Sequence, residues 1–287
     1  MFGQVVVGPP GSGKSTYCAA VVEFLRGLGR NVCVVNLDPA NERCAYEPDL
    51  DIRDLVQLDA VASEHALGPN GALIYCMEVL EKNVDWLIDH LVELSRTHDA
   101  CRYFLLDLPG QAELFTHHHA LKHVLDELVY QPKLRMRLCT VNLVDVHYCL
   151  DSSRFVSVLL HSWCTMLHLE QPHVNLVTKM DLADQFEGMN IRTEAFSADS
   201  EYVLDTDHLV EQLDQGHKAG RFASLNAALL EAVDDYAQVW FYTLNLSDRD
   251  CMLHAQMKID QAMGYVFREQ DALRAAAQAQ ARAQTNE

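Results

Sequence analysis

The sequence has no closely paired cysteines, no long apolar run and little positive charge, and each of these absences excludes a class of protein. The nine cysteines of the 287-residue chain stand singly, without a C-x-x-C pair, which argues against a zinc knuckle or a thioredoxin-type site. No apolar stretch reaches the roughly 18 residues needed to cross a bilayer, so we expect no membrane partner. The chain enters a strand-like run at Phe2, which leaves no room for a cleavable secretory signal, and unpaired cysteines suit a reducing compartment. We therefore expect a cytoplasmic protein.

The charge balance is strongly acidic, with 22 Lys and Arg residues against 41 Asp and Glu residues and a formal net charge of −19. A field of this sign repels polyphosphate backbones at long range, and no basic run interrupts it, so we expect no direct nucleic-acid partner. At 49% hydrophobic residues, the chain can fill a core. We predict a single domain over residues 1–270 and an Ala/Gln-rich tail over residues 271–287.

Six short apolar runs recur along the chain, with helical patterns between them. They cover residues 4–7, 31–37, 103–108, 140–144, 174–177 and 239–244. Most are apolar almost without interruption, as expected of strands that are covered on both faces. This pattern predicts an α/β fold with a doubly wound, mainly parallel sheet, whose functional loops lie at the carboxyl ends of the strands.

Two intervals between these runs are too long for simple crossovers. The first carries helical spacing from Leu55 to Leu94, and the second carries it late, from Leu225 to Val233. We interpret them as helical insertions over about residues 45–99 and 184–235; the alternative is that both are ordinary crossover helices.

The strongest motif is GPPGSGKS at residues 8–15, which satisfies G-x-x-x-x-G-K-[ST] between the first strand and a helix. Glycines in such a loop let backbone N–H groups turn inward around a phosphate, at a helix N-terminus whose dipole favours an anion. Lys14 would reach the β- and γ-phosphates, Ser15 would bind Mg²⁺, and Thr16 would cover the α-phosphate. The predicted phosphate-binding residues are Gly11, Ser12, Gly13, Lys14, Ser15 and Thr16.

A D-x-x-G motif, Asp107 to Gly110, closes the third run. The Asp107 carboxylate can hold Mg²⁺ through water, and the Gly110 N–H can sense the γ-phosphate. Gln111 follows at once, where its carboxamide could orient the attacking water. Because Asp-Leu-Pro-Gly is also a good turn, the motif gains its weight from its position after a strand.

The fifth run ends in Thr178, Lys179, Met180 and Asp181, which match [NT]-K-x-D. The Asp181 carboxylate can accept hydrogen bonds from N1–H and the 2-amino group of guanine, and adenine offers neither donor in that geometry. Behind the two earlier motifs, this one predicts GTP and GDP as ligands.

Two further positions have competing interpretations. Asp38 closes the second run, where it could hold Mg²⁺ and polarise a water, or serve as a turn or helix-capping residue. Gly68 to Gly71 reads GPNG, and spacing alone favours a tight connection between two helices.

The chain resembles the GPN-loop GTPases, and most closely the second of their three eukaryotic paralogues. The blocks that carry this resemblance are GPPGSGKSTYC, VVNLDPANE, GPNGALIYCMEVLEKNVDWL, DLPGQAELFTHHHALK, LVDVHYCLD and TKMDL. The resemblance implies membership of the NTPase class that includes signal-recognition-particle GTPases and MinD-like ATPases. It also implies a dimer, homotypic or with a paralogue, in which the Gly-Pro-Asn loop of one subunit enters the site of the other.

Carried onto this sequence, the resemblance makes Asn70 a catalytic residue, Asp38 a catalytic or Mg²⁺-linked carboxylate and Asp107 a Mg²⁺-shell ligand. It further implies a role with RNA polymerase II and III subunits or assembly factors, including nuclear import, which would take the protein into the nucleus as well. Thr178 departs from the family pattern, because GTPases more often have Asn there.

We therefore predict a dimeric, Mg²⁺-dependent GTP hydrolase that uses Lys14, Asp38, Asn70 and Gln111 in catalysis. One alternative is a slow-hydrolysing, nucleotide-gated scaffold or chaperone module built from the same motifs. Another is a P-loop kinase or ATPase, although the interval 184–235 offers only Arg192 and Arg221 for a kinase-type lid.

Overall fold

The strands form one seven-stranded sheet in a computed structural model that describes residues 1–41, 44–97, 101–149, 152–185, 223–236 and 241–265. The strand order is β3-β2-β4-β1-β5-β6-β7, and every neighbouring pair is parallel. The strands are β1 (Phe2–Val7), β2 (Val32–Asn36), β3 (Leu50–Asp51), β4 (Tyr103–Asp107), β5 (Arg137–Asp145), β6 (His173–Thr178) and β7 (Phe241–Thr243).

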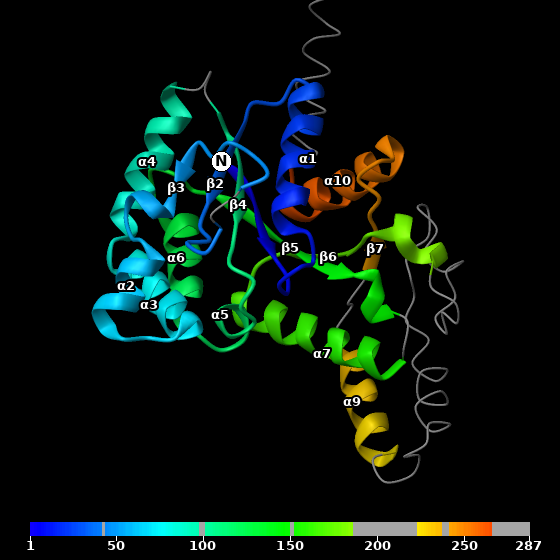
Figure 1. The fold of residues 1–287 in the computed structure, drawn as a ribbon. Coiled ribbons are helices and arrows are strands. Elements are labelled where there is room, and N and C mark those ends of the chain that lie inside the picture. Colours follow the sequence, from blue (N-terminus) through cyan, green and yellow to red (C-terminus); the bar gives the residue numbers. More distant parts are fainter. Residues whose placement is uncertain (42–43, 98–100, 150–151, 186–222, 237–240, 266–287) are drawn as a thin grey trace, which may run out of the picture.

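Helices cover both faces of this sheet (Figure 1). They are α1 (Lys14–Gly27), α2 (Leu58–His65), α3 (Pro69–Lys82), α4 (Val84–Thr97), α5 (Glu113–Thr116), α6 (His119–Tyr130), α7 (Ser152–Leu169), α9 (Ala223–Tyr236) and α10 (Arg249–Met263). Three 3-10 turns accompany them: η1 (Ile52–Asp54), η2 (Val146–Cys149) and η3 (Met180–Gln185). The predicted doubly wound α/β fold is confirmed.

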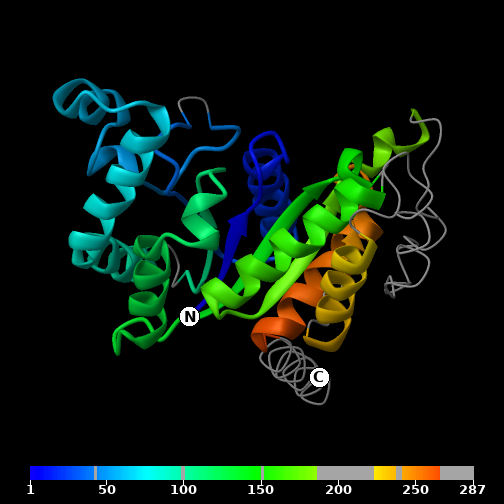
Figure 2. The ribbon, with the colours of Figure 1, turned by 90° about the horizontal axis from the view of Figure 1, so that it is seen from below.

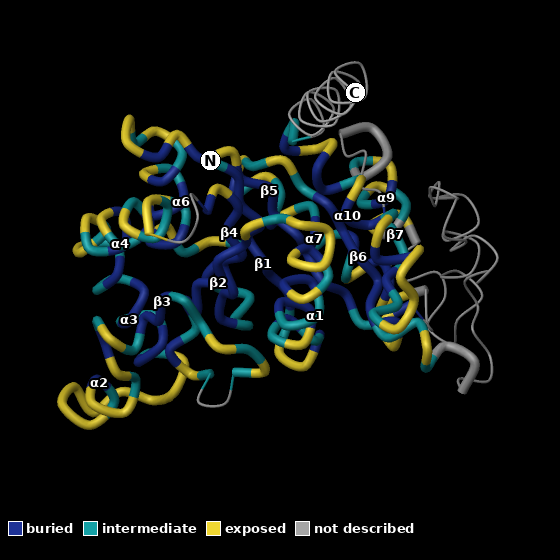
Figure 3. The backbone as a smooth tube through the Cα atoms, turned by 90° about the horizontal axis from the view of Figure 1, so that it is seen from above, coloured by how far each residue is buried: buried dark blue, intermediate teal, exposed yellow. Residues whose placement is uncertain are grey.

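The uninterrupted apolar runs of the sequence are explained by the two covered faces. In β1, Val5 and Val7 pack into the core beneath α3, α4 and α6, whereas Val6 packs with α1 and α10 on the opposite face. All three valines are fully buried. A third cluster joins α7 and α9 to the ends of β5 and β6 and to Phe241 of β7. Figure 3 shows the same arrangement, with buried strands at the centre and the most exposed backbone around α2.

The six predicted strands are present, and the structure adds β3. Leu50 and Asp51 pair with Val35 and Asn36 of β2 at the edge of the sheet. The two residues are too short a run to give a recognisable apolar pattern, so the sequence does not reveal this strand.

The interval after β2 contains β3, η1, α2, α3 and α4, so the helical spacing predicted from Leu55 to Leu94 is confirmed. These helices lie beyond the β3 edge of the sheet, and α3 packs against α2 and α6 (Figure 2). The helix expected from Leu225 to Val233 corresponds to α9. The rest of the second predicted insertion, 186–222, and the tail 271–287 lie outside the described residues, and the single-domain boundaries stay a prediction.

In the described part of the chain, no helix is both long enough and apolar enough to cross a membrane. The carboxyl ends of the strands lie at the same end of the sheet, because all the strands are parallel; this holds for β1, β2, β4, β5 and β6. The P-loop, Asp38, Asp107 and the TKMD motif all lie at this end of the sheet.

Candidate active site

The P-loop connects β1 to α1 in a shape that suits an anion. Gly11 and Gly13 have φ angles of 79° and 93°, in the left-handed region that favours glycine. A Cβ atom on either would meet no heavy atom within 4 Å. Gly13 directly precedes the first residue of α1, so the loop lies at the positive end of the helix dipole, where unpaired N–H groups favour an anion. The loop therefore has the backbone shape expected of a phosphate cradle, and phosphate binding by its residues stays a prediction.

Lys14 extends over this loop. Its side chain is 9% exposed, and its Nζ donates to the carbonyl oxygens of Gly8 (3.0 Å) and Pro9 (3.3 Å). Burial lowers the pKa of Lys14, while the carboxylates of Asp107 and Asp38 oppose that shift. The structure thus gathers one ammonium and two carboxylates around the P-loop.

Asp107 accepts two hydrogen bonds on the same oxygen. Its Oδ2 takes the hydroxyl of Ser15 at 2.9 Å and that of Tyr46 at 2.7 Å, and Asn41 Nδ2 donates in turn to Ser15 Oγ at 3.0 Å. Asp107 is only 1% exposed, and burial raises the pKa of its carboxyl group above the ordinary value. Its Oδ1 is buried without a hydrogen-bond partner among the described groups.

This arrangement fits a magnesium ion. Mg²⁺ prefers oxygen donors and is bound by one or two protein groups together with waters and substrate phosphates. The unpaired Oδ1 of Asp107 and the Ser15 hydroxyl supply such donors beside the phosphate cradle. No group of three or more His, Cys, Asp or Glu residues suited to a metal occurs in the described chain, so phosphate and water would have to complete the coordination shell.

Asp38 has the turn role of its two competing interpretations, and its catalytic or Mg²⁺-linked role stays a prediction. Its Oδ1 accepts the Ala40 N–H at 2.9 Å, which makes it a turn residue, and it also lines the pocket above the P-loop. Burial raises the pKa of Asp38, and Lys14 lowers it in part.

The segment after β4, which contains Gly110, lies close to the P-loop. A Cβ on Gly110 would lie 2.8 Å from Lys14 Nζ, so this glycine allows close packing against the P-loop.

A pocket of about 530 Å³ unites most of the predicted site residues. It is lined by Pro10, Gly11, Gly13, Lys14, Ser15, Thr16, Asp38, Ala40, Asn41, Leu73, Gly110, Gln111 and Lys179. Gln111 therefore lines the same pocket as Lys14, and its water-orienting role stays a prediction. Asn70 is exposed at the start of α3 and does not line this pocket, although Leu73 of the same helix does.

The TKMD motif is tied to the P-loop through Thr178. Its Oγ1 donates to the carbonyl oxygens of Ser12 (3.0 Å) and Val144 (3.2 Å), and the residue is buried. Met180 packs against the cluster between α7 and α9, and Asp181 is exposed at the beginning of η3. The end of β6 is thus followed by an exposed carboxylate, at the same end of the parallel sheet as the P-loop.

The comparisons with known proteins agree with this geometry. Residues 6–265 match a family described as "Conserved hypothetical ATP binding protein". GPN-loop GTPase 2 of Danio rerio is 47% identical over 266 residues, covering 93% of this chain and 82% of that protein. GPN-loop GTPase QQT1 of Arabidopsis thaliana is 43% identical over 272 residues, covering 95% and 88%. The chain belongs to the GPN-loop GTPase family.

Within that family, the chain is most like the second paralogue, as the sequence blocks predicted: GPN-loop GTPase 2 of Xenopus tropicalis is also 44% identical over 270 residues, covering 93% of this chain and 84% of that protein. A GTPase of Pyrococcus abyssi, solved in its apo form, has the same fold, with a TM-score of 0.69 at 21% identity and coverage of 91% and 97%. The finer grouping with signal-recognition-particle GTPases and MinD-like ATPases stays a prediction.

The family description names ATP, whereas these relatives are named GTPases. The names of these relatives support guanine, and the guanine contact of Asp181 in the TKMD motif stays a prediction.

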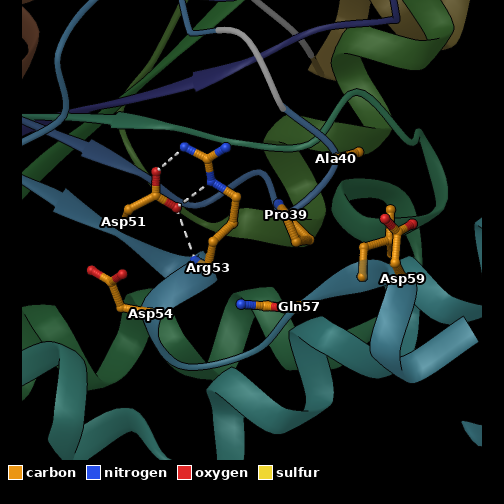
Figure 4. A pocket seen from close by; sticks show the side chains of 8 residues that line it. Pro39, Ala40, Asp51, Arg53, Asp54, Gln57 and Asp59 are labelled. Carbon is orange, nitrogen blue, oxygen red and sulfur yellow. Dashed lines mark hydrogen bonds and ion pairs between the residues drawn. The ribbon is translucent and has the colours of Figure 1, made fainter.

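A second hollow adjoins the GPN-loop GTPase site at Ala40 (Figure 4). It has a volume of about 410 Å³ and is lined by Pro39, Ala40, Asp51, Arg53, Asp54, Gln57, Leu58 and Asp59. The Arg53 guanidinium donates to both carboxylate oxygens of Asp51, from Nε at 2.9 Å and from one terminal nitrogen at 2.6 Å. This ion pair links η1 to β3, and the three aspartates make the hollow unfavourable for phosphate.

Four residues at the site were not predicted as site residues from the sequence: Asn41, Tyr46, Leu73 and Asp145. Asn41 and Tyr46 contact Ser15 and Asp107, as described above, and Asp145 forms an ion pair with Lys179. A signal existed for Asp145, because it directly follows a predicted strand of a parallel sheet. Tyr46 gave none, since its place against Asp107 depends on the path of the loop after β2.

Proposed function

We propose that this chain is a Mg²⁺-dependent enzyme that hydrolyses GTP to GDP and phosphate as a dimer. The observation that carries the proposal is the link between the motifs: Thr178 joins the guanine-type motif to the P-loop, and Ser15 joins the P-loop to Asp107. Its membership of the GPN-loop GTPase family supports the same activity.

The residues divide the chemistry between them. Lys14 stabilises negative charge that develops on the phosphoryl oxygens, and the P-loop amides do the same without reorganisation. Gln111 and Asp38 orient and polarise the attacking water at the pocket wall. Mg²⁺, when held by Ser15 and Asp107, supplies charge neutralisation on the phosphate oxygens.

Asn70 completes the site from a second subunit, either another copy or a paralogue. Gly68 caps α3 and Pro69 is its first residue, so the next backbone N–H groups have no acceptor within the helix. They point outward at the positive end of the helix dipole, which suits a phosphate. Asn70 is exposed and outside its own pocket, which supports action on a partner.

A complementation experiment tests both the activity and the dimer. Lys14→Ala and Asn70→Ala are each expected to abolish most multiple-turnover phosphate release. In a one-to-one mixture allowed to exchange subunits, half of the dimers are mixed, and each mixed dimer has one complete site. The mixture should recover about a quarter of the wild-type rate.

Verified mixed dimers without recovery would remove Asn70 from the partner's site. A wild-type rate no higher than spontaneous hydrolysis would instead favour a nucleotide-gated scaffold or chaperone module.

The wider role proposed for the chain is assembly and nuclear import of RNA polymerase II and related complexes, in the cytoplasm and through shuttling to the nucleus. The family resemblance supports this role. Affinity purification with the GTP-bound and GDP-bound protein tests it, and polymerase subunits should be retained by one nucleotide state only.

A further inference from the structure

Asp145 ends β5 beside the TKMD motif. In the sheet register it lies opposite Thr178, the first residue of that motif. Its Oδ2 is 2.6 Å from the Nζ of Lys179, the second residue, and its Oδ1 accepts the His147 N–H at 2.9 Å. Both oxygens of this largely buried carboxylate therefore have a partner. The His147 contact fixes the orientation of the carboxylate that binds Lys179.

Lys179 has a backbone conformation that needs such support. Its φ is 59°, in the left-handed region that residues with a side chain rarely adopt. Strained residues of this kind persist only where their surroundings fix them, and they concentrate at functional sites. The Lys179 carbonyl also accepts the Leu182 N–H at 2.9 Å, so its conformation sets the start of η3 and the place of Asp181.

Charge explains why the lysine needs a partner. Lys179 lines the same pocket as Lys14, and a bound polyphosphate would attract both ammonium groups. The ion pair with Asp145 opposes that attraction for Lys179. Its alkyl chain then stays beside Asp145, and long lysine side chains of this kind can cover flat apolar surfaces.

We propose that Asp145 is a positioning residue for guanine recognition, which holds Lys179 against the base and thereby places Asp181 for its contact with guanine. This inference rests on the proposed GTP-binding function. Thr178 makes guanine recognition more dependent on Asp145. Its hydroxyl donates to the carbonyl oxygens of Ser12 and Val144, and its side chain has no amide that could contact the base.

The test compares two nucleoside diphosphates that differ in the base with a polyphosphate that has no base. Binding of GDP, ADP and inorganic tripolyphosphate is measured by calorimetry for wild type and Asp145→Asn. We expect the variant to bind GDP about tenfold more weakly, the size of one coupled contact. Binding of tripolyphosphate should stay the same or strengthen, because Lys179 is released toward the phosphates.

A double-mutant cycle separates positioning from general damage. Lys179→Gly removes the side chain while its backbone tolerates the positive φ, so Asp145→Asn should weaken GDP binding no further in that background. Asp89→Asn is the matched control, because Asp89 forms an exposed pair with Lys133 at 3.4 Å; it should bind GDP like wild type.

Equal losses for GDP and tripolyphosphate, or additive losses in the cycle, would overturn the role of Asp145. Unchanged GDP binding by Asp145→Asn with an intact wild-type preference for GDP would overturn this inference alone. A wild type that binds ADP as tightly as GDP would overturn the guanine assignment itself. Thermal unfolding of each variant shows that the compared proteins are folded.

Discussion

The Tyr46 hydroxyl donates to Oδ2 of Asp107 at 2.7 Å, on the oxygen that also accepts from Ser15. The loop after β2 is thereby attached to the carboxylate that fits magnesium. Tyr46 also packs against the core between α1, α10 and the sheet, so the hydrogen bond links that core to the site.

Tyr46→Phe should lower the stability of the metal-free protein. The change keeps the ring and removes one hydrogen bond to a buried carboxylate, at a cost of about 1–2 kcal/mol. It should also raise the pKa of Asp107 further, since this bond is the main contribution that lowers it. Urea unfolding in the presence of a chelator measures the first effect, and an unchanged urea midpoint would contradict it.

Asp107→Asn should stabilise the metal-free protein at neutral pH. Burial raises the pKa of Asp107 above its ordinary value of 3.8, so at pH values between the unfolded and the native pKa the native state binds more protons than the unfolded state. The contribution of Asp107 to stability is therefore full below about pH 3.8 and is lost as pH rises through the native pKa.

Asparagine has no such cost, so the variant should gain about 1 kcal/mol at pH 7 and show a flatter pH dependence above pH 4. Its nucleotide binding should no longer respond to Mg²⁺. Unfolding in chelator at several pH values checks this prediction, and a variant less stable than wild type throughout would refute it.

The sequence predicted the fold well because its strongest signals are local. Apolar runs such as Gln4 to Val7 need no tertiary information to be recognised, and GPPGSGKS defines the junction of β1 and α1 by itself. Leu50 and Asp51 become a strand only by pairing with β2, which a two-residue pattern cannot indicate.

The site was predictable where one residue acts within its own motif. Lys14, Gln111 and Lys179, which the sequence predicted as site residues, line one pocket of the structure. Tyr46 and Asp145 were missed because they act through contacts between distant segments, which only the folded chain brings together. Asn70 and Asp181 lie at exposed positions, and their predicted roles stay predictions.

Gly110→Ala should weaken nucleotide binding more than it destabilises the fold. The new Cβ would lie 2.8 Å from Lys14 Nζ and 3.1 Å from the backbone nitrogen of Pro10, so it must displace the lysine or the P-loop. We expect GDP affinity to fall about tenfold, with a stability loss of about 1 kcal/mol.

Gly27→Ala is the matched control for this change. Gly27 ends α1, and a Cβ there would meet nothing within 4 Å, so alanine should leave binding unchanged and stabilise by about 0.5–1 kcal/mol. Equal GDP affinity in the two variants would show that Gly110 has no steric role at the site.

Arg30→Ala should destabilise the fold without direct loss of nucleotide affinity. Arg30 and Asp260 form an ion pair at 2.7 Å with side chains 9% and 3% exposed, and the guanidinium also lies 4.4 Å from the Tyr265 ring centroid. Removing the arginine leaves a buried carboxylate, which costs about 3–5 kcal/mol. Arg30 precedes the amino end of β2, at the end of the sheet opposite the P-loop, so the folded fraction should bind GDP like wild type.

Arg26→Ala is the control: its side chain is 53% exposed and 3.7 Å from Asp49, so its loss should cost no more than about 1 kcal/mol. Similar urea midpoints for the two variants would show that the buried pair adds nothing beyond a surface contact.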